Sequence, residues 1–138
     1  MNDIMNLFSL NGKNAVVTGA NTGLGQGICV ALAAAGAHVF GVARRSCDET
    51  AAKIAAEGGQ FTEVRADLSD FAAIDSILEQ VHAHADRIDI LVNNAGIIKR
   101  IPMTEMSAAQ FRQVIDVDLN APFIVAKSVI PDMIEQGG

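Results

Sequence analysis

Short apolar runs alternate with longer amphipathic segments along this chain. The apolar runs predict buried strands at residues 15–18, 38–42, 61–64 and 88–92. Their near-continuous apolar character is typical of parallel strands that are covered on both faces of a sheet. Gly19 ends the first run, and a helical spacing of apolar positions begins soon after it.

Helical periodicity fills the segments between and after these runs. It predicts helices at residues 23–35, 49–56, 70–85 and 107–137. Gly36 stops the first of them. At the start of the last helix, Ser107 and Gln110 have the spacing of a capping box. Pro122 lacks an N–H donor, so it should kink or restart that helix.

Strands that alternate with helices predict an α/β fold, because parallel neighbours need a crossover connection. Right-handed crossovers give a Rossmann-like doubly wound parallel sheet, incomplete, with four strands in the order 3-2-1-4 and helices on both faces. No linker or repeat divides residues 1–138, which are expected to form a single domain. Ligands bind such sheets where the winding reverses, so residues 19–25 and 93–96 should form opposite lips of one crevice.

The charge and composition narrow the class of protein. The 138 residues include 10 Lys and Arg against 16 Asp and Glu, which gives a formal charge of −6. This acidic balance argues against nucleic acid or an anionic membrane as the main partner. Apolar residues make up 50% of the chain, which excludes intrinsic disorder, and no apolar run has the length of a membrane span.

The expected compartment follows from the first residues and from the thiols. Residues 1–10 carry Asp3 and no basic stretch, so they lack the pattern of a secretory signal. Cys29 and Cys47 are then expected to be reduced thiols of a cytoplasmic protein. His82 and His84 lie two positions apart and point to different sides of a predicted helix, so no metal site is expected.

A glycine-rich segment, TGANTGLGQG, follows the first predicted strand. Glycine allows a sharp turn there and lets a phosphate approach the free N–H groups of the following helix. This placement predicts a dinucleotide-binding loop, and the Lys-Ser/Thr ending of a nucleotide-hydrolysing loop is absent. A plain strand-to-helix turn is the alternative. The candidate cofactor-binding residues in this segment are Gly19, Asn21, Thr22, Gly23, Leu24 and Gly25.

The end of the second strand should meet the adenosine ribose of a bound dinucleotide. An acidic residue there would favour NAD, because it accepts a hydrogen bond from the 2′-hydroxyl. This chain has Ala43, Arg44 and Arg45 instead. A guanidinium can pair with a 2′-phosphate, so Arg44 favours NADP over NAD, unless both arginines are solvated loop charges.

Three motifs together resemble the short-chain dehydrogenase/reductase family. The glycine segment, Asp67-Leu68 and Asn93-Asn94-Ala95-Gly96 follow the family's order, each at the end of a predicted strand. The resemblance implies that Asp67 and Leu68 contact the adenine of the cofactor. It also implies cofactor contacts for Asn93, Ala95 and Gly96, with turn formation as the alternative role of the two asparagines.

Within the family, residues 8–10, 23–27 and 94–100 look most like dehydrogenases of sugar acids. The most similar types are 2-deoxy-gluconate 3-dehydrogenase and gluconate 5-dehydrogenase. This resemblance implies that Lys99 or Arg100 orients a substrate carboxylate, with a solvated loop charge as the alternative.

The family's chemistry implies hydride transfer between a nicotinamide cofactor and a small carbonyl or alcohol substrate. A tyrosine acts as general acid and base, assisted by a lysine, a serine and a relay asparagine. This chain contains no tyrosine and stops at Gly138, before the family's serine and Tyr-x-x-x-Lys motif. We therefore expect the cofactor-binding half of an NAD(P)-dependent oxidoreductase, inactive on its own.

Asp118 occupies the position of the family's relay asparagine. A carboxylate cannot donate a hydrogen bond as an amide does, so an impaired proton relay is expected. Asp118 shares a helix face with Phe111 and Ile115. Its burial there would favour protonation, unless the end of the chain opens and hydrates the carboxylate.

The fourth strand should keep one unpaired apolar edge, because the family's fifth strand lies beyond Gly138. We therefore expect a homo-oligomer, with exchange of the segment from Ser107 onward as one route to it. Two other hypotheses stay open at this point. The chain could be a non-catalytic dinucleotide-binding or association module, or a shortened product without a role of its own.

Overall fold

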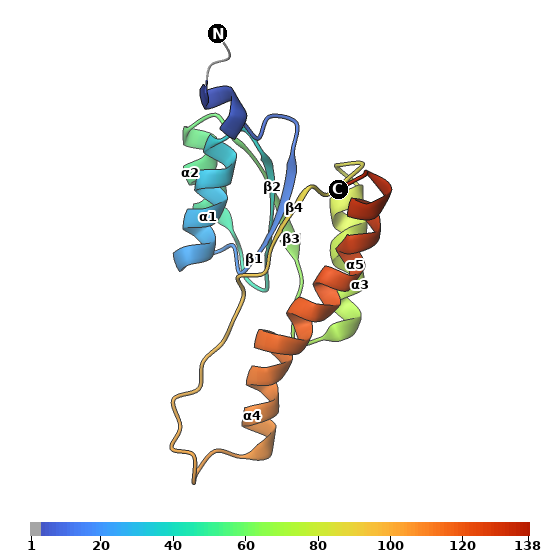
Figure 1. Cartoon of the computed structure of the whole chain (residues 1–138). Coiled ribbons are helices and arrows are strands. Elements are labelled where there is room, and N and C mark those ends of the chain that lie inside the picture. Colours follow the sequence, from blue (N-terminus) through green and yellow to red (C-terminus); the bar gives the residue numbers. More distant parts are fainter. Residues whose placement is uncertain (1–3) are drawn as a thin grey trace.

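Four parallel strands form the centre of the structure, a computed structural model that describes residues 4–138 (Figure 1). The strands are β1 (Asn14–Thr18), β2 (His38–Ala43), β3 (Gln60–Arg65) and β4 (Ile90–Val92). Their order in the sheet is β3-β2-β1-β4, which confirms the predicted topology. In the parallel register, Val16 of β1 lies opposite Phe40 of β2 on one side and Leu91 of β4 on the other.

Helices cover both faces of this sheet, as predicted. The helical elements are η1 (Ile4–Phe8), α1 (Gly23–Ala34), α2 (Asp48–Ala56), α3 (Phe71–His82), α4 (Ala108–Ile115), η2 (Asp116–Asn120) and α5 (Ala121–Glu135). The helices α1 and α2 lie against one face, and α3 and α5 lie against the other (Figure 1). The short 3₁₀-helix η1 was not predicted.

Successive strand residues feed two separate cores, because side chains alternate between the faces of a sheet. Val16 and Phe40 are fully buried against Ile77 of α3 and Val125 of α5. Their neighbours Val17 and Val39 pack in the second core, with Cys29 of α1 and Ile54 of α2. Full burial of such a side chain stabilises the fold by about 1.5–3 kcal/mol. The two cores hold the strand ends, and the loops that leave them, in fixed positions.

The last predicted helix is three consecutive elements. Its start is the predicted capping box: the Ser107 hydroxyl accepts from the Gln110 N–H, and the Gln110 side chain accepts from the Ser107 N–H. The π-helical turn η2 then precedes α5, and Pro122 stands in the first turn of α5, where its missing N–H costs no helical bond. An α-helical segment thus restarts beside Pro122, one of the two predicted outcomes, although the helical backbone is continuous through Asn120 and Ala121.

The edge strand β4 begins at Ile90, two residues later than predicted, although Ile88 is fully buried. Within the described residues β4 pairs only with β1, so its other edge is unpaired. Asp3, on which the expectation about a secretory signal rests, lies outside the described residues. In the described part of the chain, no helix combines the length and the apolar character that crossing a membrane requires.

Candidate functional site

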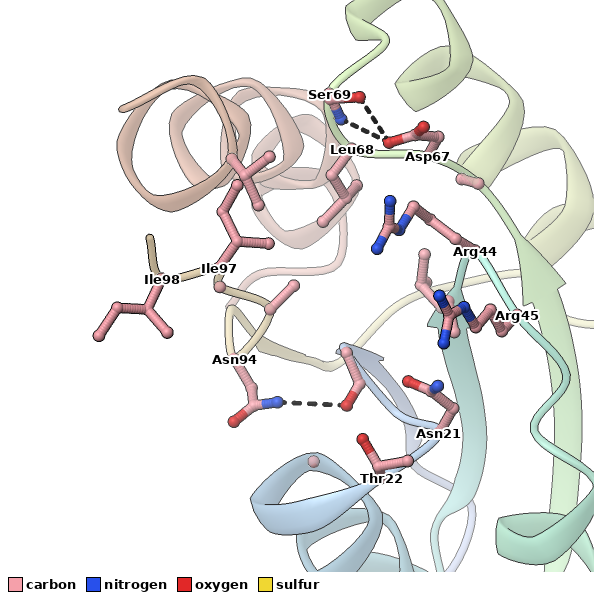
Figure 2. A pocket seen from close by; sticks show the side chains of 18 of the residues that line it. Asn21, Thr22, Arg44, Arg45, Asp67, Leu68, Ser69, Asn94, Ile97 and Ile98 are labelled. Atoms are coloured by element: carbon pink, nitrogen blue, oxygen red, sulfur yellow. Dashed lines mark hydrogen bonds between the residues drawn. The ribbon is translucent and has the colours of Figure 1, made fainter. Parts of the chain in front are cut away.

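A cleft of about 650 Å³ opens at the carboxyl ends of the strands, where α1 begins and the loop after β4 leaves the sheet. Figure 2 shows side chains from both lips around this space. Ten of the twelve predicted cofactor-binding residues line it: Gly19, Asn21, Thr22, Leu24, Gly25, Arg44, Asp67, Leu68, Ala95 and Gly96. Two predicted residues, Gly23 and Asn93, do not. The side-chain amide of Asn93 instead lies 3.4 Å from the Pro122 carbonyl and donates to it.

The first lip is the glycine loop between β1 and α1. Gly19 adopts a φ of 68°, a conformation that glycine accepts without strain. A Cβ on Gly25 would collide with the Gly19 carbonyl oxygen, and a Cβ on Gly19 would lie 2.9 Å from the Cα of Ala95. Glycine is therefore required at both positions, because the loop packs against itself and against the chain after β4.

The start of α1 keeps its N–H groups available for a ligand. Its N-cap residue, Thr22, makes no side-chain capping hydrogen bond, and the first turn of α1 holds no acidic residue. By contrast, Asp70 caps α3 and Ser107 caps α4 through their own side chains. Free N–H groups and the positive end of a helix dipole attract anions such as phosphate. This lip of the cleft can therefore hold a negatively charged group.

Asn94 ties the loop to the end of β4. Its side-chain amide donates to the Thr18 carbonyl at 3.0 Å and to the Gly19 carbonyl at 3.3 Å. In return, the Thr18 hydroxyl accepts from the backbone N–H groups of Asn94 and Ala95, each at 3.0 Å. Of the two asparagines, Asn94 thus fixes the relative position of the two lips, whereas Asn93 reaches away towards α5.

Two guanidinium groups form the far wall of the cleft. Arg44 and Arg45 leave the end of β2, and Figure 2 shows their side chains directed towards the open space. Hydrogen bonds from the hydroxyl and the N–H of Ser69 lower the pKa of Asp67, and the nearby charge of Arg44 lowers it further. Asp67 is consequently ionised at neutral pH and offers an acceptor beside the two arginines.

Sequence reasoning missed part of the lining. Ser69, Ile97, Ile98, Gln113 and Val117 line the cleft without having been candidates, and Arg45 lines it beside Arg44. Ser69 directly follows a candidate, so its position alone could have suggested it. Gln113 and Val117 are four residues apart and therefore lie on the same helical face. That this face is directed towards the cleft is known only from the folded structure. Lys99 lines the cleft and Arg100 does not, which separates the two candidates for carboxylate recognition.

Asp118 is exposed, so of the two alternatives the solvated carboxylate holds and burial in the apolar face does not. Its Oδ1 accepts a hydrogen bond from the Ile97 N–H at 2.8 Å. The π-helical turn η2 carries Asp118 towards the chain after β4, where a Cβ on Gly96 would stand 3.4 Å from the same oxygen. The carboxylate therefore braces the second lip of the cleft.

The two thiols lie in the core beside α1 and α2. Burial raises the pKa of Cys29 to about 12, with a further contribution from Cys47, and it raises the pKa of Cys47 to about 11. Both thiols are free and protonated at neutral pH. Among the described residues, no three His, Cys, Asp or Glu side chains gather as a metal site requires.

Comparison with known proteins places this chain among dehydrogenases. The sequence model of the short chain dehydrogenase family matches residues 13–138. A 2-dehydro-3-deoxy-D-gluconate 5-dehydrogenase of Dickeya dadantii is 40% identical over 134 residues, a match that covers 97% of this chain and 53% of the relative.

Solved structures agree in both sequence and fold. A protein of Agrobacterium tumefaciens, provisionally assigned as a 2-deoxy-d-gluconate 3-dehydrogenase and solved with bound NADP, is 44% identical with a TM-score of 0.83, covering 94% of this chain and 51% of its own. A protein of Beutenbergia cavernae, provisionally assigned as an NAD(P) dependent gluconate 5-dehydrogenase and solved with NADP at low occupancy, is 42% identical with a TM-score of 0.87, covering 95% and 53%. This chain spans about half the length of the relatives it matches. Because the family match extends over nearly the whole sequence, the chain belongs to the short-chain dehydrogenase family.

Proposed function

We propose that residues 1–138 form one nucleotide-binding domain, and that its cleft binds a nicotinamide dinucleotide. The diphosphate would lie at the free N–H groups of the loop from Gly19 to Gly25, and the adenosine half would extend towards Asp67 and Leu68. Ala95 and Gly96, on the opposite lip, would border the nicotinamide half. The observation that carries this proposal is the start of α1, which faces the cleft without a side-chain cap or an acidic residue.

The residues of the cleft fit such a ligand in charge and in shape. Its volume of about 650 Å³ lies in the range of cofactor pockets. Anionic phosphates find donors on both sides, from the loop amides and from the guanidinium groups of Arg44 and Arg45. A Cβ on Gly25 would collide with the Gly19 carbonyl oxygen, so the loop keeps this shape only with glycine at that position.

NADP is the preferred form of the cofactor in this proposal. Two arginines stand where an acidic residue would accept from the 2′-hydroxyl of NAD, and a guanidinium can bind a 2′-phosphate through paired hydrogen bonds. Similar solved structures from Agrobacterium tumefaciens and Beutenbergia cavernae contain NADP. Both arginines reach the cleft, which supports a binding role over that of solvated loop charges.

We expect the whole protein to be an oxidoreductase whose substrate is a sugar acid. When bound, the nicotinamide supplies or accepts the hydride exchanged with a carbonyl or alcohol carbon. Lys99, at the cleft, would orient the carboxylate of such a substrate, as an ammonium group pairs with an anion. The 138 residues contribute binding and orientation, since they include no tyrosine for the family's proton transfer.

A non-catalytic dinucleotide-binding module is the second candidate, and Asp118 favours it. At the position of the family's relay asparagine, this carboxylate accepts one hydrogen bond and donates none. In a full-length protein, Asp118→Asn should raise turnover if the family's relay operates. Unchanged turnover would remove this argument for impaired proton transfer.

Self-association is part of the proposal. Apolar side chains of η2 and α5 are exposed along one side: Leu119, Phe123, Ile130 and Ile134. The second edge of β4 is also unpaired within the described residues. Contiguous exposed apolar surface and free strand edges favour contact with another copy. Sedimentation that shows a stable monomer at high concentration would contradict this expectation.

Calorimetric titration with NADPH and NADH tests the binding proposal directly. We expect both to bind and NADPH to bind more tightly. Arg44→Ala should weaken NADPH by about tenfold or more while changing NADH little, because it removes a charged partner of the 2′-phosphate alone. No heat with either coenzyme at millimolar concentration, in a folded sample, would overturn the proposal.

A further inference from the structure

A buried polar chain connects the outer surface of α2 with the glycine loop. Lys53 Nζ donates to Gln26 Oε1 at 2.7 Å. The Gln26 amide donates in turn to Thr50 Oγ1 at 3.1 Å and to the Asn21 carbonyl at 3.2 Å. The Thr50 hydroxyl donates to the Ala20 carbonyl at 2.8 Å. The Gln26 amide group, which has two N–H donors, thus has two acceptors, and the single O–H of Thr50 has one.

The two inner members are deeply buried. Thr50 is completely inaccessible and Gln26 is 9% exposed, whereas the outer end carries the exposed ion pair of Lys53 with Glu49 at 3.2 Å. A buried polar side chain costs free energy unless it is hydrogen-bonded, so packing alone does not account for Gln26 and Thr50 at these positions. Apolar residues of similar size would fill the same space, but they would leave the loop carbonyls without partners.

These contacts fix the direction of two loop peptides. In a trans peptide the carbonyl of one residue and the N–H of the next point in opposite directions, and the described residues contain no cis peptide. Because the Ala20 carbonyl points to Thr50, the Asn21 N–H points away from it. Because the Asn21 carbonyl points to Gln26, the Thr22 N–H points away from Gln26. Asn21 and Thr22 both line the cleft.

The same arrangement continues on the other side of the loop. The Thr18 and Gly19 carbonyls accept from Asn94, and the Thr22 carbonyl accepts from the Gln26 N–H at 3.2 Å. Five successive carbonyls, from Thr18 to Thr22, are therefore each held by a donor of the chain itself. Within the described residues, the N–H groups of Asn21 and Thr22 have no such partner.

We propose that Gln26, Thr50 and Lys53 are positioning residues, which aim the Asn21 and Thr22 amides into the cleft and thereby set the affinity for the dinucleotide. The effect on affinity rests on the function proposed above, whereas the effect on loop order does not. None of the three side chains belongs to the cleft lining, so they act through the loop.

Two variants break this chain of hydrogen bonds, one at each end. Thr50→Val removes the inner hydroxyl at nearly constant volume, and Lys53→Met removes the outer donor from an exposed position where folding is not at risk. Thr50→Ser keeps the hydroxyl and serves as the rescue. Matched controls on the same helix are Ile54→Val, which removes one buried methyl group, and Glu49→Gln, which breaks the ion pair but leaves the Lys53–Gln26 bond in place.

Calorimetry with NADPH gives the first measurement. Thr50→Val should weaken binding by about tenfold and Lys53→Met by less, with Thr50→Ser and both controls close to the unchanged chain. If the unchanged chain binds NADPH and both Thr50→Val and Lys53→Met bind it equally well, the positioning role is overturned and the proposed function stands.

Backbone ¹⁵N relaxation of the ligand-free chain gives the second measurement, which does not depend on binding. Order parameters of residues 20–22 should be near the rigid value of about 0.85 and should fall in Thr50→Val but not in Ile54→Val. Failure of the unchanged chain to bind NADPH would overturn the proposed function. In that case unaltered order parameters in Thr50→Val would overturn the positioning role as well. A decrease at residues 20–22 would support the role of the Thr50 hydrogen bond in holding the loop.

Discussion

The side-chain amide of Asn94 donates to the carbonyl of Thr18 at 3.0 Å, and the hydroxyl of Thr18 accepts from the backbone N–H of Asn94 at the same distance. Two residues 76 positions apart in sequence thus hold each other from both directions. The contact joins the ends of β1 and β4, the two strands between which the cleft opens. The geometry of the cleft therefore depends on this pair.

Asn94→Asp should lower the free energy of unfolding by about 1–3 kcal/mol, because a carboxylate cannot donate and two partly buried carbonyls lose their partner. Chemical denaturation measures this change. Asn93→Asp is the matched control, since Asn93 makes one 3.4 Å contact with the Pro122 carbonyl from an exposed position. Equal effects of the two substitutions would show that Asn94 has no special role in joining the lips.

Gly25→Ala and Gly27→Ala should have opposite effects on stability, although the two glycines are only two positions apart in α1. A Cβ at Gly25 would meet the Gly19 carbonyl oxygen and the Asn94 side chain, so overpacking should cost about 1–3 kcal/mol and distort the loop. A Cβ at Gly27 would meet nothing within 4 Å, and alanine should stabilise the helix by up to about 1 kcal/mol. Thermal unfolding distinguishes the two, and NADPH titration should show a loss for Gly25→Ala alone.

The ring of His38 should give the stability a measurable pH dependence. Burial lowers the pKa of His38, with a smaller contribution from the charge of His84, and the ring stacks on Phe40 at 4.2 Å between centroids. Because the folded state has the lower pKa, this contribution is complete above about pH 6.5 and is lost as the pH falls through the folded pKa.

We therefore expect the melting temperature to fall between about pH 7 and about pH 5, and His38→Gln to make that fall smaller. An NMR titration of the His38 ring should place its pKa below the ordinary value. In His84→Gln the pKa should move back upwards, because one repelling positive charge is gone. A His38 pKa above the ordinary value would contradict this account.

Both cysteines should resist alkylation in the folded chain. The nucleophile is the thiolate, and burial holds the pKa of Cys29 at about 12 and that of Cys47 at about 11. At about pH 8, iodoacetamide should modify neither thiol, and in concentrated urea it should modify both, as mass spectrometry can count. Rapid modification of Cys47 without denaturant would mean that the loop after β2 opens readily.

The sheet order was predictable because short runs with apolar residues alternate with helix-forming segments, although β3 includes the polar residues Gln60, Glu63 and Arg65. Local rules also located the capping box at Ser107 and the restart near Pro122. The π-helical turn was not predictable, since no residue type specifies it. Its consequence is the position of Asp118, whose side chain turns towards Ile97 and out of the apolar face that the simple helical spacing assigned to it, so only the structure decides between a buried and a solvated carboxylate.

The cleft was predictable where one short motif carries it. The glycine segment and the arginines after β2 identify seven of the lining residues, and the family resemblance adds Asp67, Leu68, Ala95 and Gly96. The contacts that hold the lining were not accessible in this way. Gln26 and Thr50 lie 24 positions apart, and their chemistry is uninformative until α1 and α2 pack side by side. Gln113 and Val117 likewise reach the cleft only because α4 and η2 extend beneath the ends of the strands (Figure 1).

A loop whose carbonyls are all held internally has a consequence for the speed of association. We expect the backbone to be ordered in the free chain, so that an incoming anion need not wait for a slow rearrangement. Encounter should then follow a single kinetic phase, accelerated by the positive field of Arg44 and Arg45 and slowed by added salt. Differences in affinity among ligands would consequently come from their dissociation rates.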